Sequence, residues 1–135
     1  KQELTPLKAL FTITVTGIDV LKFTSVSLWK MHFQCLHNND TYDIYANKGR
    51  KFSVYKNDVQ LAYWDKQAVN WFNGENFKIY ADSDANKELL IAFCLILDNY
   101  GNTINNINTG SALSIDIGNI GFGLKKFDAD WKPKE

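Results

Sequence analysis

The most informative part of the sequence is the stretch Glu88–Asp98, which reads ELLIAFCLILD. Its nine central residues, Leu89–Leu97, are all apolar, so the stretch shows neither the alternation of a half-exposed strand nor the stripe of an amphipathic helix. Residues that favour helix N-caps precede it at 82–84, and a segment that contains Asn and Gly follows it at 99–102. The pattern predicts a helix over about residues 84–99 that is apolar on every side.

A helix that is apolar on every side must be surrounded by other apolar surface. In a chain of otherwise short strands, the economical arrangement is an antiparallel β-barrel, or a strongly curled sheet, that wraps around a central hydrophobic helix. The alternative is that Leu89–Leu97 forms a central strand buried on both faces, because periodicity alone does not separate the two. The predicted fold class is mainly β (α+β).

Alternation of apolar and polar residues dominates the rest of the chain. The segments that it predicts as strands are 11–16, 20–36, 41–46, 51–55, 60–64, 68–72 and 76–81, with further alternation at 113–117 and 120–124. A turn is expected at His37–Asp40, where short polar side chains tolerate left-handed backbone. Short strands at such even spacing predict an antiparallel meander.

The sequence contains one internal repeat, because GRKFSVY at residues 49–55 recurs as GENFKIY at residues 74–80. Each copy places a turn glycine ahead of an aromatic and a β-branched residue of the same parity, which predicts two equivalent hairpins. The residues expected to point inward are Phe52, Val54, Phe77 and Ile79, and those expected on the opposite face are Tyr55 and Tyr80.

Composition indicates one domain over residues 1–135, and fifteen Lys plus Arg balance fifteen Asp plus Glu. A net charge of zero gives no global field for a polyanion, so no nucleic-acid partner is expected. Cys35 and Cys94 are too few for a disulfide framework, and no run reaches the roughly 20 apolar residues of a transmembrane segment. We expect a cytoplasmic or membrane-peripheral protein, and the high Asn and Ile content indicates a low-GC bacterial source.

The string over residues 42–101 resembles the tubby-like C-terminal superfamily, in the branch of the LURP-one-related proteins and the phospholipid scramblases. The residues that carry the resemblance are Gly49, Phe52, Val54, Tyr55, Gly74, Phe77, Ile79, Leu90–Leu97 and Asp98. It implies a closed antiparallel barrel around a hydrophobic helix, and a role at lipids. In that superfamily the helix lies close to the C-terminus, whereas more than thirty residues follow it here. The Cys-rich tract and Pro-rich arm of the scramblases are missing, so scramblase activity is not implied.

Basic residues cluster in the first copy of the repeat. Lys48, Arg50 and Lys51 lie at the predicted hairpin tip, and the register of the repeat places Lys78 one strand pair away on the outward face. With the two tyrosines of the repeat, they are the candidate ligand-binding residues for an anionic headgroup or phosphate. The ordinary alternative is a charged, solvated turn.

Two other patterns resemble metal sites. Asp82, Asp84 and Asn86 have the spacing that opens a calcium loop, but Lys87 replaces its glycine and Phe93 stands at its bidentate carboxylate position. The favoured interpretation is that a residue within 82–84 caps the helix.

His32, Cys35 and His37 could only bring two ligands together, because His32 faces the other side of a strand. We therefore expect one solvent-facing histidine, one turn histidine, a core thiol and no metal. Trp64 and Trp71 could line a ligand groove, but cross-strand packing is the commoner role of such pairs.

The sequence contains no motif of nucleophilic, phosphate-binding or dinucleotide-binding enzymes. The first hypothesis is a non-catalytic binding or scaffold module without a cofactor, which binds anionic lipid headgroups or a protein partner. The second is a carrier of lipocalin or fatty-acid-binder type, which requires that Leu89–Leu97 be a strand around an open lumen. The third is an enzyme, which requires a pocket that joins Asp43, Asp65 or Asp116.

Overall fold

Seven strands and one helix make up the part of the chain that the computed structural model describes, namely residues 10–13, 21–27, 31–47, 51–65, 78–107 and 127–135. The strands are β1 (Leu10–Ile13), β2 (Leu21–Ser27), β3 (His32–His37), β4 (Asp40–Asn47), β5 (Lys51–Lys56), β6 (Val59–Asp65) and β7 (Lys78–Ala81), and the helix is α1 (Lys87–Ile107).

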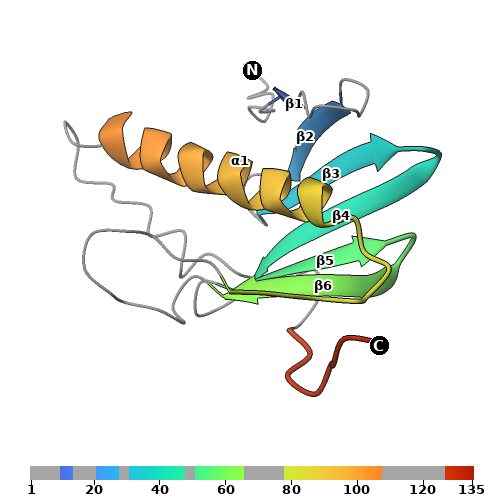
Figure 1. The fold of residues 1–135 in the computed structure, drawn as a ribbon. Helices are drawn as coiled ribbons and strands as arrows, with labels where there is room; N and C mark the ends of the chain where they lie inside the picture. Colours follow the sequence, from blue (N-terminus) through green and yellow to red (C-terminus); the bar gives the residue numbers. More distant parts are fainter. Residues whose placement is uncertain (1–9, 14–20, 28–30, 48–50, 66–77, 108–126) are drawn as a thin grey trace, which may run out of the picture.

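All seven strands belong to one antiparallel sheet in the order β1-β2-β3-β4-β5-β6-β7, so each strand pairs with its neighbours in sequence. The predicted meander is confirmed. Helix α1 crosses one face of this sheet (Figure 1). Over the described residues β1 and β7 are unpaired edges and the sheet is open, so the closed barrel around a central helix is not confirmed.

Tight turns fix the register of the central strands. Asn38 and Asn39 have φ angles of 50° and 63° between β3 and β4, in the turn predicted at His37–Asp40. Asn57 and Asp58 have φ angles of 48° and 68° between β5 and β6. Two consecutive left-handed residues form the primed turn whose twist matches that of the flanking strands, and Asn and Asp tolerate this backbone better than most residues.

The predicted strand over residues 20–36 is wrong in one respect, because it is two strands. β2 ends at Ser27 and β3 begins at His32. Met31 lies between them in left-handed backbone with φ 46°, which a continuous strand does not contain. Apolar and polar residues keep alternating across the break, so the sequence pattern alone did not show that there are two strands.

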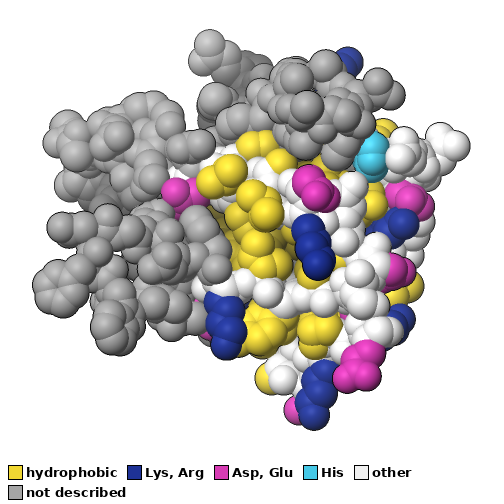
Figure 2. Space-filling view, in the orientation of Figure 1, with side chains coloured by type: hydrophobic (Ala, Val, Ile, Leu, Met, Phe, Trp, Pro, Cys, Tyr) yellow, Lys and Arg dark blue, Asp and Glu magenta, His cyan; other side chains and the backbone are white. Residues whose placement is uncertain are grey.

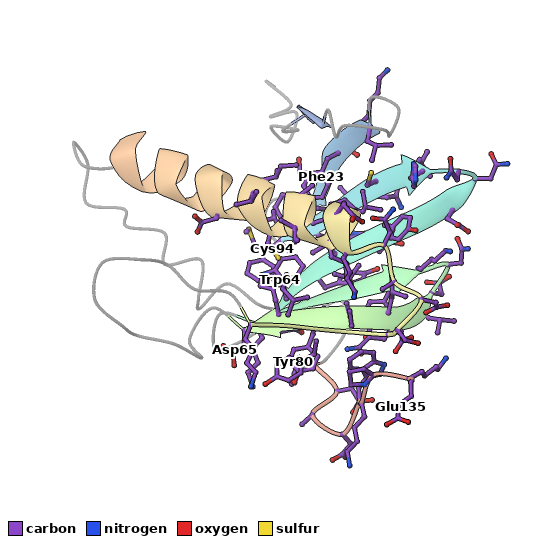
Figure 3. The ribbon with its side chains drawn as sticks, viewed as in Figure 1. Phe23, Trp64, Asp65, Tyr80, Cys94 and Glu135 are labelled. Carbon is purple, nitrogen blue, oxygen red and sulfur yellow. The ribbon has the colours of Figure 1, made fainter. Side chains whose placement is uncertain are left out.

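The core lies between α1 and one face of the sheet. Its buried members include Phe23, Phe33, Ile44, Val54 and Trp64 from the strands, and Leu89, Leu90, Phe93, Cys94 and Leu97 from the helix. Figure 3 shows Phe23, Trp64 and Cys94 in this layer. The Phe93 ring lies 5.4 Å from that of Phe23 and 5.9 Å from that of Tyr42, measured between ring centroids. These contacts attach the helix to both β2 and β4.

The apolar stretch is a helix, which overturns the alternative of a buried strand. It begins at Lys87 and ends at Ile107, so it starts later than the predicted residue 84 and continues well beyond residue 99. Asn86 is the N-cap, since its Oδ1 accepts a hydrogen bond from the Leu89 amide at 2.9 Å. The predicted cap within residues 82–84 is therefore wrong.

Over the described residues, α1 is not enclosed on every side. Ile91 and Leu95 are 50% and 53% exposed, on the side of α1 away from the sheet. Figure 2 shows hydrophobic side chains at the surface, bordered by Lys, Asp and Glu. The expectation that an all-apolar helix must be surrounded is not met by the described residues.

The repeat behaves as predicted where it is described. Phe52 and Val54 are buried in the core and Ile79 packs against it. Tyr55 and Tyr80 contact other aromatic residues on the opposite face. The second predicted inward aromatic, Phe77, lies outside the described residues, as do the predicted strand 68–72 and the alternating segments 113–117 and 120–124.

Candidate functional site

The sheet face opposite α1, here called the outer face, carries a continuous set of polar and aromatic side chains. Antiparallel pairing places Gln34 beside Asp43 and Asp43 beside Tyr55, and it places Ser53 beside Tyr63 and Tyr63 beside Tyr80. Since α1 covers the other face, the outer face is the part of the sheet that remains for recognition.

Two of the four predicted ligand-binding residues lie on either side of Asp65. Register pairs Asp65 of β6 with Lys51 of β5 and with Lys78 of β7. Lys51 and Lys78 are called the lysine pair below. The Lys51 ammonium lies 3.9 Å from the Asp65 carboxylate, a separation typical of a weak, partly exposed ion pair.

Lys78 is exposed and lies against Tyr80. Its ammonium is 4.9 Å from the centre of the Tyr80 ring, and a hydrogen bond to the Tyr80 hydroxyl raises the pKa of Lys78. None of the carboxylates in the described ranges forms an ion pair with it. Among the described residues, Asp65 thus has a lysine as its partner in the register on each side.

An aromatic cluster adjoins the lysine pair and consists of Tyr63, Tyr80, Phe127 and Trp131. Tyr63 stacks on Tyr80 with ring centroids 4.6 Å apart, and Phe127 and Trp131 meet it edge-on at 5.1 and 5.8 Å. The Lys51 ammonium lies 4.7 Å from the centre of the Phe127 ring. Cationic and aromatic side chains thus share one surface at this end of the outer face. Figure 3 shows Asp65 and Tyr80 near the C-terminal segment, away from α1.

The predicted cationic tip is only partly described. Lys48 and Arg50 lie outside the described residues. Lys51 and Lys78 lie on either side of Asp65 in the register, and Lys78 contacts Tyr80. Tyr55 belongs to another part of the outer face, where its ring meets that of Tyr45 edge-on at 5.6 Å.

A buried histidine–aspartate pair is a feature that sequence reasoning missed. His32 Nε2 lies 2.7 Å from Asp43 Oδ1, and Gln34 Nε2 donates to the same oxygen at 3.1 Å. The His32 ring also stacks on Tyr45 with centroids 4.4 Å apart. Only 8% of His32 is exposed, so the prediction of a solvent-facing histidine is wrong. The predicted turn at 37–40 could have indicated this pair, because the register that it sets places Gln34 opposite Asp43 and His32 opposite Tyr45.

Tyr55 and Gln60 continue this polar layer. The Tyr55 hydroxyl donates to Gln60 Oε1 at 3.3 Å, and burial raises the pKa of Tyr55, with a further contribution from the Asp128 carboxylate. The Gln60 side-chain nitrogen is buried and has no hydrogen-bond partner among the described residues. The outer face is therefore closely packed around Tyr55 and Gln60.

In the calcium-like motif, the side-chain oxygens of Asp82 and Asn86 accept hydrogen bonds from main-chain amides. Asp82 Oδ1 accepts the Lys134 amide at 2.8 Å and Asn86 Oδ1 accepts the Leu89 amide. In the described part of the chain, no group of three or more His, Cys, Asp and Glu residues could hold a metal ion. In the turn, His37 Nε2 lies 3.1 Å from Asn38 Nδ2. Burial raises the pKa of the Cys35 thiol to about 11.

The other predicted site residues are dispersed. Trp64 is buried in the core and stacks on Phe52 with centroids 5.0 Å apart, while Trp71 lies outside the described residues. Asp43 is held by His32 and Asp65 by Lys51, at different positions of the sheet. The third candidate carboxylate, Asp116, falls outside the described ranges.

Comparison with protein-family models, with curated proteins and with solved structures gives no match to this chain. Over the described ranges, none of the helical structure has the length and apolar character needed to cross a membrane.

Proposed function

We propose that this protein is a non-catalytic binding module that takes an anionic group, such as a phospholipid headgroup, at the lysine pair of the outer face. The observation that carries the proposal is the arrangement around Asp65. One carboxylate lies between two lysines in the register, and Lys78 is exposed without a described ion-pair partner. An anion that meets both ammonium groups would accept charge-assisted hydrogen bonds from each of them.

The aromatic cluster supports a membrane surface as the source of that anion. Tyr and Trp are favoured at the headgroup level of bilayers, where one end of the ring is in apolar and the other in polar surroundings. Tyr63 and Tyr80 are half-buried on the sheet next to the lysine pair. Each lysine near an anionic leaflet contributes about 1 kcal/mol of attraction.

The packing of α1 supports binding on the outside of the fold. A lipocalin-type carrier needs an open lumen, whereas Leu89, Leu90 and Phe93 fill the space against the sheet. The carrier hypothesis required that Leu89–Leu97 be a strand, but this segment is helical. The enzyme hypothesis required a pocket that joins the candidate carboxylates, but Asp43 and Asp65 contact different partners.

We also propose that the chain encloses α1 more fully, as the resemblance to the tubby-like superfamily implies. The half-exposed Ile91 and Leu95 support this, since they leave apolar surface on the far side of the helix. Enclosure predicts that Leu95→Asp destabilises the fold by several kcal/mol in urea unfolding, whereas an open helix predicts a change below about 1 kcal/mol.

The binding proposal is tested by co-sedimentation with vesicles at physiological salt. Neutral vesicles are compared with vesicles that contain a phosphoinositide, for the wild type and for the double variant Lys51→Ala/Lys78→Ala. The expected result is binding that needs the phosphoinositide and falls roughly ten-fold or more in the double variant.

The matched control is Lys22→Ala/Lys56→Ala, which removes the same charge elsewhere. Lys56 stands at the opposite end of β5 from Lys51, and its ammonium is paired with Asp40 at 2.9 Å. An equal loss of binding in this control would attribute the attraction to net charge and not to the lysine pair. Failure of the wild type to bind phosphoinositide vesicles would overturn the proposal.

A further inference from the structure

The last described segment, Phe127–Glu135, is called the C-terminal strap below. It has no helix or strand, and it lies on the side of the sheet away from α1 (Figures 1 and 3). Two independent sets of contacts hold it there, and one of them involves the lysine pair.

The first set is aromatic. Phe127 and Trp131 both meet the Tyr63 ring edge-on, and the Phe127 ring lies over the Lys51 ammonium. The Lys51 side chain is only 35% exposed. One of the two cations proposed to bind an anion is thus in contact with the chain's own C-terminal segment.

The second set is a pair of hydrogen bonds at the turn before α1. The Lys134 amide donates to Asp82 Oδ1 at 2.8 Å, and the Ser83 amide donates to the Lys134 carbonyl oxygen at 3.0 Å. Asp82 is 5% exposed, so this contact is shielded from water. A shielded hydrogen bond to a charged acceptor is stronger than one between neutral exposed groups.

The strap also carries two exposed carboxylates in a turn. Asp128 and Asp130 are exposed in a turn closed by a hydrogen bond from the Asp130 amide to Asp128 Oδ1 at 2.9 Å. The Asp128 carboxylate contributes to the raised pKa of Tyr55.

We propose that the strap is an intramolecular cover of the lysine pair, and that an anionic membrane surface must displace it to reach Lys51 fully. The inference rests on the function proposed above and adds its regulation. The apparent affinity for the membrane is then the affinity of the uncovered form multiplied by the fraction of molecules in which the strap is displaced. A strap that is docked nine-tenths of the time would weaken binding about ten-fold.

The test locks the strap by a disulfide in the variant Ser83→Cys/Lys134→Cys, whose main chains are already hydrogen-bonded at this point. The native thiols do not interfere, because burial raises the pKa of Cys35 to about 11 and that of Cys94 to about 12. Oxidised and reduced samples of the same protein carry the same substitutions, so each is the control of the other. Both are sedimented with phosphoinositide vesicles.

The expected result is that oxidation, which removes the displaced form, weakens vesicle binding by well over ten-fold and that reduction restores it. Equal binding by the two forms overturns the cover while leaving the binding function intact, whereas no binding by the wild type and by either form overturns both.

In a second variant, Phe127→Ala, loss of the ring over Lys51 is expected to strengthen binding several-fold. Ala129→Ser, at an exposed position of the strap, is expected to leave it unchanged. Weaker binding by Phe127→Ala would also contradict the inference.

Discussion

The main-chain amide of Lys134 donates a 2.8 Å hydrogen bond to the carboxylate of Asp82, across 52 residues of sequence. The main chain of Asp82 forms two further hydrogen bonds, because its amide donates to the Leu61 carbonyl and its carbonyl accepts the Ala85 amide. The turn between β7 and α1 is thereby joined to β6 on one side and to the C-terminal strap on the other.

Replacement of Asp82 by Ala is expected to destabilise the protein by about 1–3 kcal/mol, because the Lys134 amide loses a shielded, charged acceptor. Asp84→Ala, two residues away at an exposed position, should change the free energy of unfolding by no more than about 0.5 kcal/mol. Urea unfolding of both variants checks this. Equal losses would show that charge near the helix start, and not the bond to Lys134, stabilises the turn.

The N-cap assignment makes a separate prediction. Asn86→Ala should lower the free energy of unfolding by about 0.5–2 kcal/mol, since the Leu89 amide loses its acceptor. Ser83→Ala, which removes a residue that sequence alone favours as a cap, should cost less than about 0.5 kcal/mol. A larger effect at Ser83 than at Asn86 would refute the assignment. Thermal unfolding followed by circular dichroism is sufficient to compare them.

Phe93 is expected to be the strongest single attachment of α1 to the sheet. Its ring is fully buried between Phe23 and Tyr42, so Phe93→Ala should cost about 3–5 kcal/mol through lost contacts and a cavity. Leu36→Ala is the matched control, because Leu36 is a large apolar residue that is 63% exposed. It should cost less than about 1 kcal/mol. Chemical denaturation measures both, and similar costs would contradict the described core.

The two tight turns predict a pH dependence. A hydrogen bond from Lys56, aided by Asn57, lowers the pKa of Asp40 below its ordinary value of 3.8. The folded pKa lies below the unfolded one, so this contribution to stability is fully present above pH 3.8 and is lost as pH falls through the folded pKa. Asp40→Asn should abolish that part of the decline. Unfolding free energies of the two proteins at neutral pH and below pH 3.8 test this, and parallel declines would contradict it.

Much of the fold was predictable because local patterns and the final packing agree. The alternation at 41–46 and 51–55 and the polar turn at 37–40 specify strands and register that the structure contains. The end of α1 was not predictable in this way, because Asn99 and Gly101 disfavour helix only weakly and the helix continues through them. The exposure of Ile91 and Leu95 was missed because the pattern shows how apolar a segment is, but not what covers it.

The candidate site was predictable only in part. The repeat correctly predicted that Lys78 and Tyr80 lie on the same face of one strand, because residues two positions apart in a strand point to the same side. The pairing of His32 with Asp43 needs the register of two strands and a diagonal contact, which parity alone does not supply. The contact of Phe127 with Lys51 joins residues from distant parts of the chain, and no local pattern predicts it.

Anion binding at the lysine pair is tested most directly by an amide chemical-shift titration of the isotope-labelled protein with a soluble inositol trisphosphate headgroup. Binding there predicts saturable shifts at Lys51, Asp65 and Lys78, with smaller ones along the strap at Phe127 and Trp131. Shifts confined to the exposed side of α1, at Ile91 and Leu95, or the absence of any saturable shift, would contradict the claim that the lysine pair of the outer face binds an anionic group.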